Sequence, residues 1–210
     1  MKNILKLFLT VGLISSFQSQ AQEDVILKGK ELFGDIRARQ IGPAIMSGRI
    51  SDIANHPTNN KIIYIGAAGG GVWKSSDGGA SFSPLFDKHI QSIGCVTIDP
   101  NNPDNTIWVG TGEPWTRNSV SIGDGIYKST DGGLNWTNMG LPKSDRITSI
   151  IVDPRNSDVV WAGVLGALWG DSEDRGIYKT TDGGKTWNKS FYVDQKTGCA
   201  DLVIDPVNPD

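Results

Sequence analysis

The sequence predicts an all-β protein, a β-propeller of four-stranded antiparallel blades, and three observations support this prediction. One turn motif, Ser/Thr-x-Asp-Gly-Gly with an aromatic residue three positions later, occurs three times at a near-constant spacing. Each copy lies in the same order of short β-branched and aromatic runs. The repeats contain no long segment with helical periodicity. A four-stranded unit repeated in tandem about every fifty residues is typical of a propeller.

The turn motif itself favours a structural role over a catalytic one. Asp77 and Asp131 are 54 positions apart, and Asp131 and Asp182 are 51 apart. In such turns the carboxylate accepts backbone N–H groups, the glycines adopt positive φ, and the aromatic residue begins the next strand. The predicted structural residues are Asp77, Gly79, Phe82, Asp131, Gly133, Trp136, Asp182, Gly184 and Trp187.

Aligning the turns brings three further strand patterns into register. An apolar run that ends at an Asn-His-Pro or Asp-Pro turn comes first, a β-branched run that ends in glycine follows, and a Gly-Ile/Val-aromatic-Lys strand precedes each motif. These patterns predict blades at about 45–87, 90–141 and 145–195, with a fourth beginning near 198. Since a closed propeller needs about four to eight blades, we expect the sequence to be a fragment of a longer protein.

The first residues predict export. Lys2 and Lys6 precede an apolar run over 7–14, and small residues at Ser19 and Ala21 fit cleavage after position 21. The apolar run is far shorter than the ~20 residues of a membrane span. We therefore expect a signal peptide at 1–21, a lead-in segment at 22–44, a partial propeller at 45–210, no membrane span, and a secreted or periplasmic protein.

Composition argues against several partners. Removal of residues 1–21 changes the net charge from −3 to −5, and no run of lysines and arginines is present, so we expect no nucleic-acid partner. Cys95 and Cys199 lie in the first strands of the second and fourth repeats, and we expect two buried thiols and not a disulfide between them. His56 and His89 are isolated in the sequence, which predicts no metal site and no cofactor.

The turns are identified as Asp-boxes of the bacterial neuraminidase (BNR) repeat. With the segments 41–44, 47–50, 69–74, 110–113, 117–119 and 123–125, the chain resembles secreted bacterial proteins with sortilin-type (VPS10-like) propellers, often labelled glycosyl hydrolases. The resemblance implies a carbohydrate-facing protein, either a glycosyl hydrolase or a glycan-binding protein, with a glycan or polysaccharide ligand. The alternative is a non-enzymatic, sortilin-like propeller that binds a peptide or protein.

Two departures from enzymes of similar fold leave the catalytic residues unknown. Xyloglucanase-type propellers carry a catalytic aspartate in an Arg-Thr-Asp-x-Gly-Gly segment, and Ala68 occupies the matching position here. Sialidases need an arginine triad, of which Arg49 matches one member at most. Arg49 is therefore either a structural arginine or a ligand-binding one.

Loops between the second and third strands are the predicted place of function, because they are ten and eight residues longer in the second and third repeats than in the first. Trp115 and Trp169 fit either sugar stacking or packing within their own loop. Glu113 beside Arg117 forms either a salt bridge or a ligand-recognition pair. The carboxylates of Asp171, Glu173 and Asp174 either supply acids for glycoside chemistry, which needs two across the scissile bond, or form a solvated acidic loop, and the second alternative is favoured. The candidate ligand-binding residues are Arg49, Glu113, Trp115, Arg117, Asn118 and Trp169.

Overall fold

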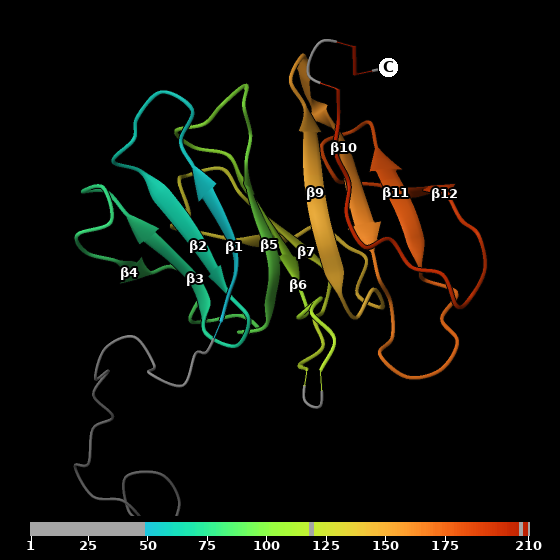
Figure 1. Cartoon of the computed structure of the whole chain (residues 1–210). Coiled ribbons are helices and arrows are strands. Elements are labelled where there is room, and N and C mark those ends of the chain that lie inside the picture. Colours follow the sequence, from blue (N-terminus) through green and yellow to red (C-terminus); the bar gives the residue numbers. More distant parts are fainter. Residues whose placement is uncertain (1–48, 118–119, 206–207, 210) are drawn as a thin grey trace, which may run out of the picture. The chain divides into compact units, whose positions relative to one another are not determined.

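The computed structural model describes residues 49–117, 120–205 and 208–209. The expected signal peptide, the lead-in segment and Asn118 therefore lie outside the described residues. Within the described ranges the chain forms strands and no helix, in three four-stranded antiparallel sheets (Figure 1). This confirms the predicted all-β class and the four-stranded blades.

Each sheet is a meander in which sequential strands are neighbours. The first blade contains β1 (Ile50–Asn55), β2 (Ile63–Ala67), β3 (Gly71–Ser75) and β4 (Ser83–Pro84). The second contains β5 (Ile93–Ile98), β6 (Ile107–Thr111), β7 (Ile126–Ser129) and β8 (Thr137–Asn138). The third contains β9 (Ile147–Asp153), β10 (Asn156–Val164), β11 (Gly176–Thr180) and β12 (Asn188–Phe191).

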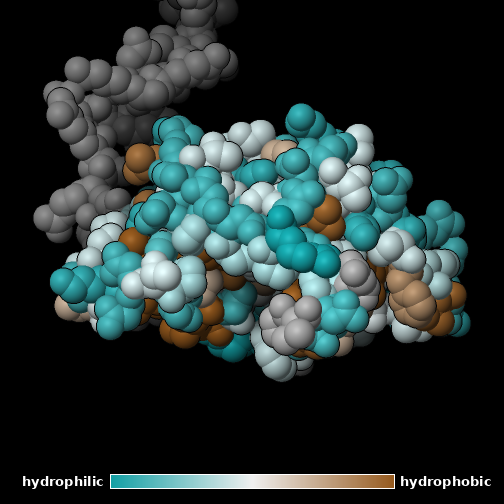
Figure 2. Space-filling view, turned by 90° about the horizontal axis from the view of Figure 1, so that it is seen from above, coloured by the Kyte–Doolittle hydropathy of each residue, from teal (hydrophilic) through white to brown (hydrophobic). Residues whose placement is uncertain are grey.

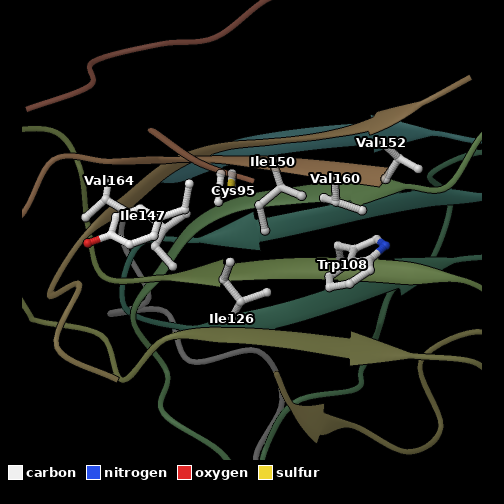
Figure 3. Close-up of a cluster of buried hydrophobic side chains, with 10 residues drawn as sticks. Cys95, Trp108, Ile126, Ile147, Ile150, Val152, Val160 and Val164 are labelled. Atoms are coloured by element: carbon white, nitrogen blue, oxygen red, sulfur yellow. The ribbon is translucent and has the colours of Figure 1, made fainter. Parts of the chain in front are cut away.

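The hydrophobic core lies between adjacent blades. One buried cluster joins Tyr64 and Val72 of the first blade to Ile93 and Val109 of the second. The other joins the second blade to the third, and Figure 3 shows side chains from both blades turned toward one another, among them Trp108 of β6 and Val160 of β10. Each fully buried large aliphatic side chain stabilises such a core by about 1.5–3 kcal/mol. Blade-to-blade packing is therefore the main source of stability.

The turn motif has the same geometry in all three copies. In the second copy, one Asp131 oxygen accepts hydrogen bonds from the Ser129 hydroxyl at 2.8 Å and from the Asn135 N–H at 2.8 Å, and the other accepts the Asn135 amide at 2.7 Å. Gly132 and Gly133 have φ of 71° and 97°, a region that glycine adopts without steric cost. The motif thus stabilises, through its own side chains, the turn between the third and fourth strand of each blade.

Each later turn also docks onto the preceding blade. The Gly132 carbonyl accepts hydrogen bonds from the Tyr64 hydroxyl at 3.0 Å and from Lys74 Nζ at 3.2 Å. One blade further on, Lys128 Nζ lies 3.3 Å from the Gly183 carbonyl oxygen. The motif therefore joins neighbouring blades as well as neighbouring strands.

The apolar run of the first repeat ends in a turn capped by histidine instead of aspartate. His56 Nδ1 accepts the backbone N–H groups of Thr58 at 3.2 Å and Asn59 at 3.0 Å, as Asp99 Oδ1 accepts that of Asn101 in the second repeat. Because Nδ1 is an acceptor, the ring proton lies on Nε2, which is 3.3 Å from Asp104. His56 is thus a turn-capping residue.

The described residues from 198 to 205 form no strand, although they run alongside β9 in space. The Cys199 N–H donates to the Val164 carbonyl at 3.0 Å, and the Leu202 N–H donates to Ser149 Oγ at 3.3 Å. Both cysteines are free thiols as predicted, but only Cys95 is buried; Cys199 is partly exposed, because no complete fourth blade covers it in the described residues. This segment therefore lies beside β9 much as β5 lies beside β1. The described part of the chain has no helix with the length and apolar character that a membrane crossing requires.

Candidate functional site

Two long connections extend from the lower edge of the blades in Figure 1, the edge opposite the β1–β2 and β9–β10 turns. The first joins β6 to β7 and carries Trp115; the second joins β10 to β11 and carries Trp169. Figure 2 views the opposite face, which is covered mostly by hydrophilic residues. The two faces thus differ: one has short turns and the other has the insertions.

Trp115 borders a groove of about 650 Å³ that runs along the innermost strands β1, β5 and β9. Its side chain is 65% exposed, which is unusual for a tryptophan in a loop held by hydrogen bonds. A second depression of about 400 Å³ is lined by Arg49, Ile50, Ser51, Trp115, Thr116 and Arg117. Trp115 therefore contributes to two concave surfaces.

The floor of the groove contains one repeated position, five residues before each turn proline. Its occupants are Asp52, Cys95, Ser149 and Asp201. The Asp52 carboxylate accepts the Val96 N–H at 2.9 Å, so it joins β1 to the next blade. Burial raises the pKa of the Cys95 thiol far above its ordinary value, which leaves the thiol protonated. The position therefore serves blade packing and supplies no activated nucleophile.

Asp201 is the other carboxylate at the groove. Its Oδ1 accepts hydrogen bonds from Ser149 Oγ at 2.9 Å and from the Leu202 N–H at 2.8 Å. Both groove carboxylates are thus used by backbone and hydroxyl donors. Cleavage of a glycosidic bond needs one carboxyl group as acid and a second as base or nucleophile, and these two are committed to structure.

Glu113, two positions before Trp115, is buried and pairs with two arginines. Its side chain is 5% exposed and forms ion pairs with Arg49 and, at 3.4 Å, with Arg117. The sequence predicted the Arg117 pair as one alternative, but it gave no sign that Arg49 of the first blade reaches the same carboxylate. A buried carboxylate is stable only when it is paired, so this triad fixes the start of the loop. Arg117 is 56% exposed and remains accessible to a ligand.

Trp169 lies in a different environment from Trp115. It is 80% exposed but is not among the residues that line the groove. Its loop is held by Arg175, which donates to the carbonyls of Leu165, Ala167 and Gly170. Of the acidic residues in this loop, Glu173 accepts the Gln195 amide at 3.2 Å. The structure thus brings together Arg49, Glu113, Trp115 and Arg117, and it does not add Trp169 to them.

Two features of the site bear on catalysis. Ala68, at the position where a similar enzyme would carry a carboxylate, is buried at the end of β2 and donates its N–H to the Arg49 carbonyl at 2.9 Å. It supplies no ionisable group. In the described ranges, no group of three or more His, Cys, Asp or Glu side chains is placed to hold a metal ion.

Sequence reasoning missed one residue of this region, Arg146. It is 3% exposed, precedes β9, and contacts both insertion loops. The available signal was its position in the repeat: Arg49, Ser92 and Arg146 each stand eight residues before a turn proline.

The sequence matches no protein-family model. It is 26% identical over 233 aligned positions to a xyloglucanase of Acetivibrio thermocellus, covering 93% of this chain and 25% of that protein. It is 30% identical over 176 positions to a xyloglucanase of Paenibacillus sp, covering 73% of this chain and 17% of that protein. The chain thus spans a quarter or less of the length of these curated relatives.

Among solved structures, the chain is similar to an ancestral GH74 enzyme. The TM-score is 0.50 and the identity 22%, with 66% of this chain and 18% of that chain covered. At this identity the likeness supports the fold, which is the propeller architecture described above. The sequence relatives named above are xyloglucanases, which are glycosyl hydrolases.

Proposed function

We propose that this chain forms a polysaccharide-binding part of a glycosyl-hydrolase-type propeller, with Trp115 as the surface on which a sugar ring stacks. The two sequence relatives described above are xyloglucanases, so a xyloglucan-type polysaccharide is the first candidate ligand. Export follows from the signal peptide expected at 1–21, because such a polymer is met outside the cell.

The observation that carries this proposal is the position of Trp115. Its indole is exposed, yet its loop is fixed at both ends, and the residue lines both a groove of about 650 Å³ and a smaller depression. Flat aromatic faces favour contact with the C–H face of a sugar, and a rigid aromatic side chain loses little entropy on binding. Arg117 beside it supplies hydrogen-bond donors for hydroxyl groups.

We assign binding, and not acid–base catalysis, to these residues. Asp52 and Asp201 are used by hydrogen bonds within and between blades, and Ala68 is not ionisable. Hydrolysis by the whole protein would need carboxyl groups that this site does not provide.

The test compares two exposed tryptophans in different places. Wild type, Trp115→Ala and Trp169→Ala are measured by affinity electrophoresis in gels that contain xyloglucan, and by release of reducing ends from the same polymer. We expect Trp115→Ala to weaken binding about tenfold or more, since it removes an aromatic contact of about 1.4 kcal/mol, and Trp169→Ala to weaken it less. Equal retardation of wild type and Trp115→Ala would disprove the assignment. A wild type that binds no polysaccharide would favour the peptide-binding alternative.

A further inference from the structure

The residue that immediately precedes the innermost strand occupies one repeat position in each blade. In the three described blades it is Arg49, Ser92 and Arg146. All three side chains reach the same element, the connection from Gly112 to Gly125 that carries Trp115. They reach it from three different blades, so the convergence is a product of how the blades pack.

The first blade holds the beginning of this connection. Arg49 pairs with the buried Glu113 carboxylate, two residues before Trp115. The second blade holds its far side: Ser92 Oγ donates to the Ser121 carbonyl at 2.8 Å, and the Ser92 carbonyl accepts the Gly112 N–H at 2.8 Å. These contacts fix the two ends of the segment that surrounds Trp115.

The third blade holds the middle. Arg146 Nη1 lies 3.4 Å from Thr116 Oγ1, next to Trp115, and its Nε and Nη2 donate to the carbonyls of Gly166 at 2.7 Å and Ala167 at 2.9 Å. The same guanidinium therefore joins the Trp115 connection to the Trp169 connection. Arg146 is buried, and its pKa is lowered from the ordinary value by that burial and by the nearby charge of Arg175.

Burying an arginine against carbonyl oxygens is costly. No ion pair to Arg146 occurs among the described residues, and the nearby Asp145 charge offsets only part of the free-energy cost of burying the guanidinium. The benefit of the buried arginine is that one planar guanidinium fixes the positions of several carbonyls and one hydroxyl at once. Backbone contacts support the same place: the Gly123 N–H donates to the Asp145 carbonyl at 2.6 Å.

We propose that Arg49, Ser92 and Arg146 are positioning residues that hold Trp115 ready for its ligand. The exposed indole has little packing of its own, so its orientation depends on the loop beneath it, and the loop is set by these three side chains. Rigidity before binding raises affinity, because the cost of ordering the loop does not fall on the binding step. The inference rests on the proposed function of Trp115.

The test uses the full chain and two measurements, only one of which needs a ligand. The variants are Arg146→Gln and the conservative substitutions Ser92→Ala and Thr116→Val. The control is Arg155→Gln, because Arg155 follows the C-terminal end of β9, whereas Arg146 precedes its N-terminal end, and Arg155 pairs with Asp153. Hydrogen exchange of residues 112–125 is followed by mass spectrometry. The dissociation constant for xyloglucan oligosaccharides is measured for each variant with Trp115 present and with Trp115→Ala.

We expect Arg146→Gln to speed exchange in 112–125 at least tenfold and to raise the dissociation constant about tenfold, with a smaller change in the same direction for Ser92→Ala and Thr116→Val. Arg155→Gln should change neither quantity. In the Trp115→Ala background the effect of these substitutions on the dissociation constant should disappear, since the positioning residues then have no indole to orient. If Arg146→Gln does not fold, Ser92→Ala and Thr116→Val decide.

Unchanged exchange in all three variants would overturn the inference, as would a loss of affinity that persists without Trp115. A wild type that binds no xyloglucan refutes the proposed function instead. In that case faster exchange in the variants still supports the role of the three positioning residues in holding the loop, and unchanged exchange still overturns it.

Discussion

Trp136 and Phe82 occupy the same position of the turn motif, yet the structure places them in different surroundings. Trp136 Nε1 donates to the Leu85 carbonyl of the first blade at 3.0 Å, and its ring meets Phe86 edge-to-face with centroids 5.1 Å apart. Phe82 is 37% exposed, and no blade on its far side is present in the described ranges. Replacing each by alanine therefore removes one motif residue in two different environments.

The contacts set the size of the two effects. Truncation of a buried tryptophan to alanine costs about 3–5 kcal/mol, which includes a hydrogen bond of about 1 kcal/mol and an aromatic pair of similar size. Because Trp136 is partly buried, we expect Trp136→Ala to cost about 3 kcal/mol. Phe82→Ala removes no such hydrogen bond and a ring that is already partly in water, so we expect about 1 kcal/mol or less.

Urea unfolding followed by far-ultraviolet circular dichroism measures the difference, since that signal comes mainly from the backbone and its midpoint does not require the tryptophan that is removed. At an unchanged slope, the midpoint of Trp136→Ala should lie well below that of Phe82→Ala. Equal losses for the two variants would show that the aromatic residue acts inside its own turn. The interpretation of the motif as a contact between blades would then be wrong.

Two further predictions concern the turns and the loop. Donors from Asn135 hold the pKa of Asp131 at about 2, below the unfolded value of about 3.9. The stabilising contribution of Asp131 is therefore complete above about pH 5 and is lost as the pH falls through about 2, so thermal midpoints between pH 2 and 5 should fall less steeply for Asp131→Asn. Gly112→Ala should lower the urea midpoint by far more than Gly78→Ala, although both glycines have positive φ. A Cβ at position 112 would lie 1.9 Å from the Asp145 carbonyl oxygen, whereas a Cβ at position 78 would have no atom within 4 Å. Similar midpoints for the two glycine variants would exclude the steric argument.

The repeat, the strands and the turns could be predicted from the residue pattern alone. The Asp-Gly-Gly motif sets its own geometry through hydrogen bonds within eight residues, such as those between Asp131 and Asn135. Short-range chemistry of this kind is visible in the residue pattern. The same period located the two insertions and so the two exposed tryptophans.

How these parts combine depends on contacts between blades, which the residue pattern does not show. The repeat position of Arg49 and Arg146 was visible in the sequence, but that both reach the Trp115 connection, one through Glu113 and the other through Thr116, was not. That Trp115 borders the groove and Trp169 does not was equally hidden. The physical reason is that these contacts join residues about 30 to 60 positions apart, and the rotation of one blade against the next brings them together.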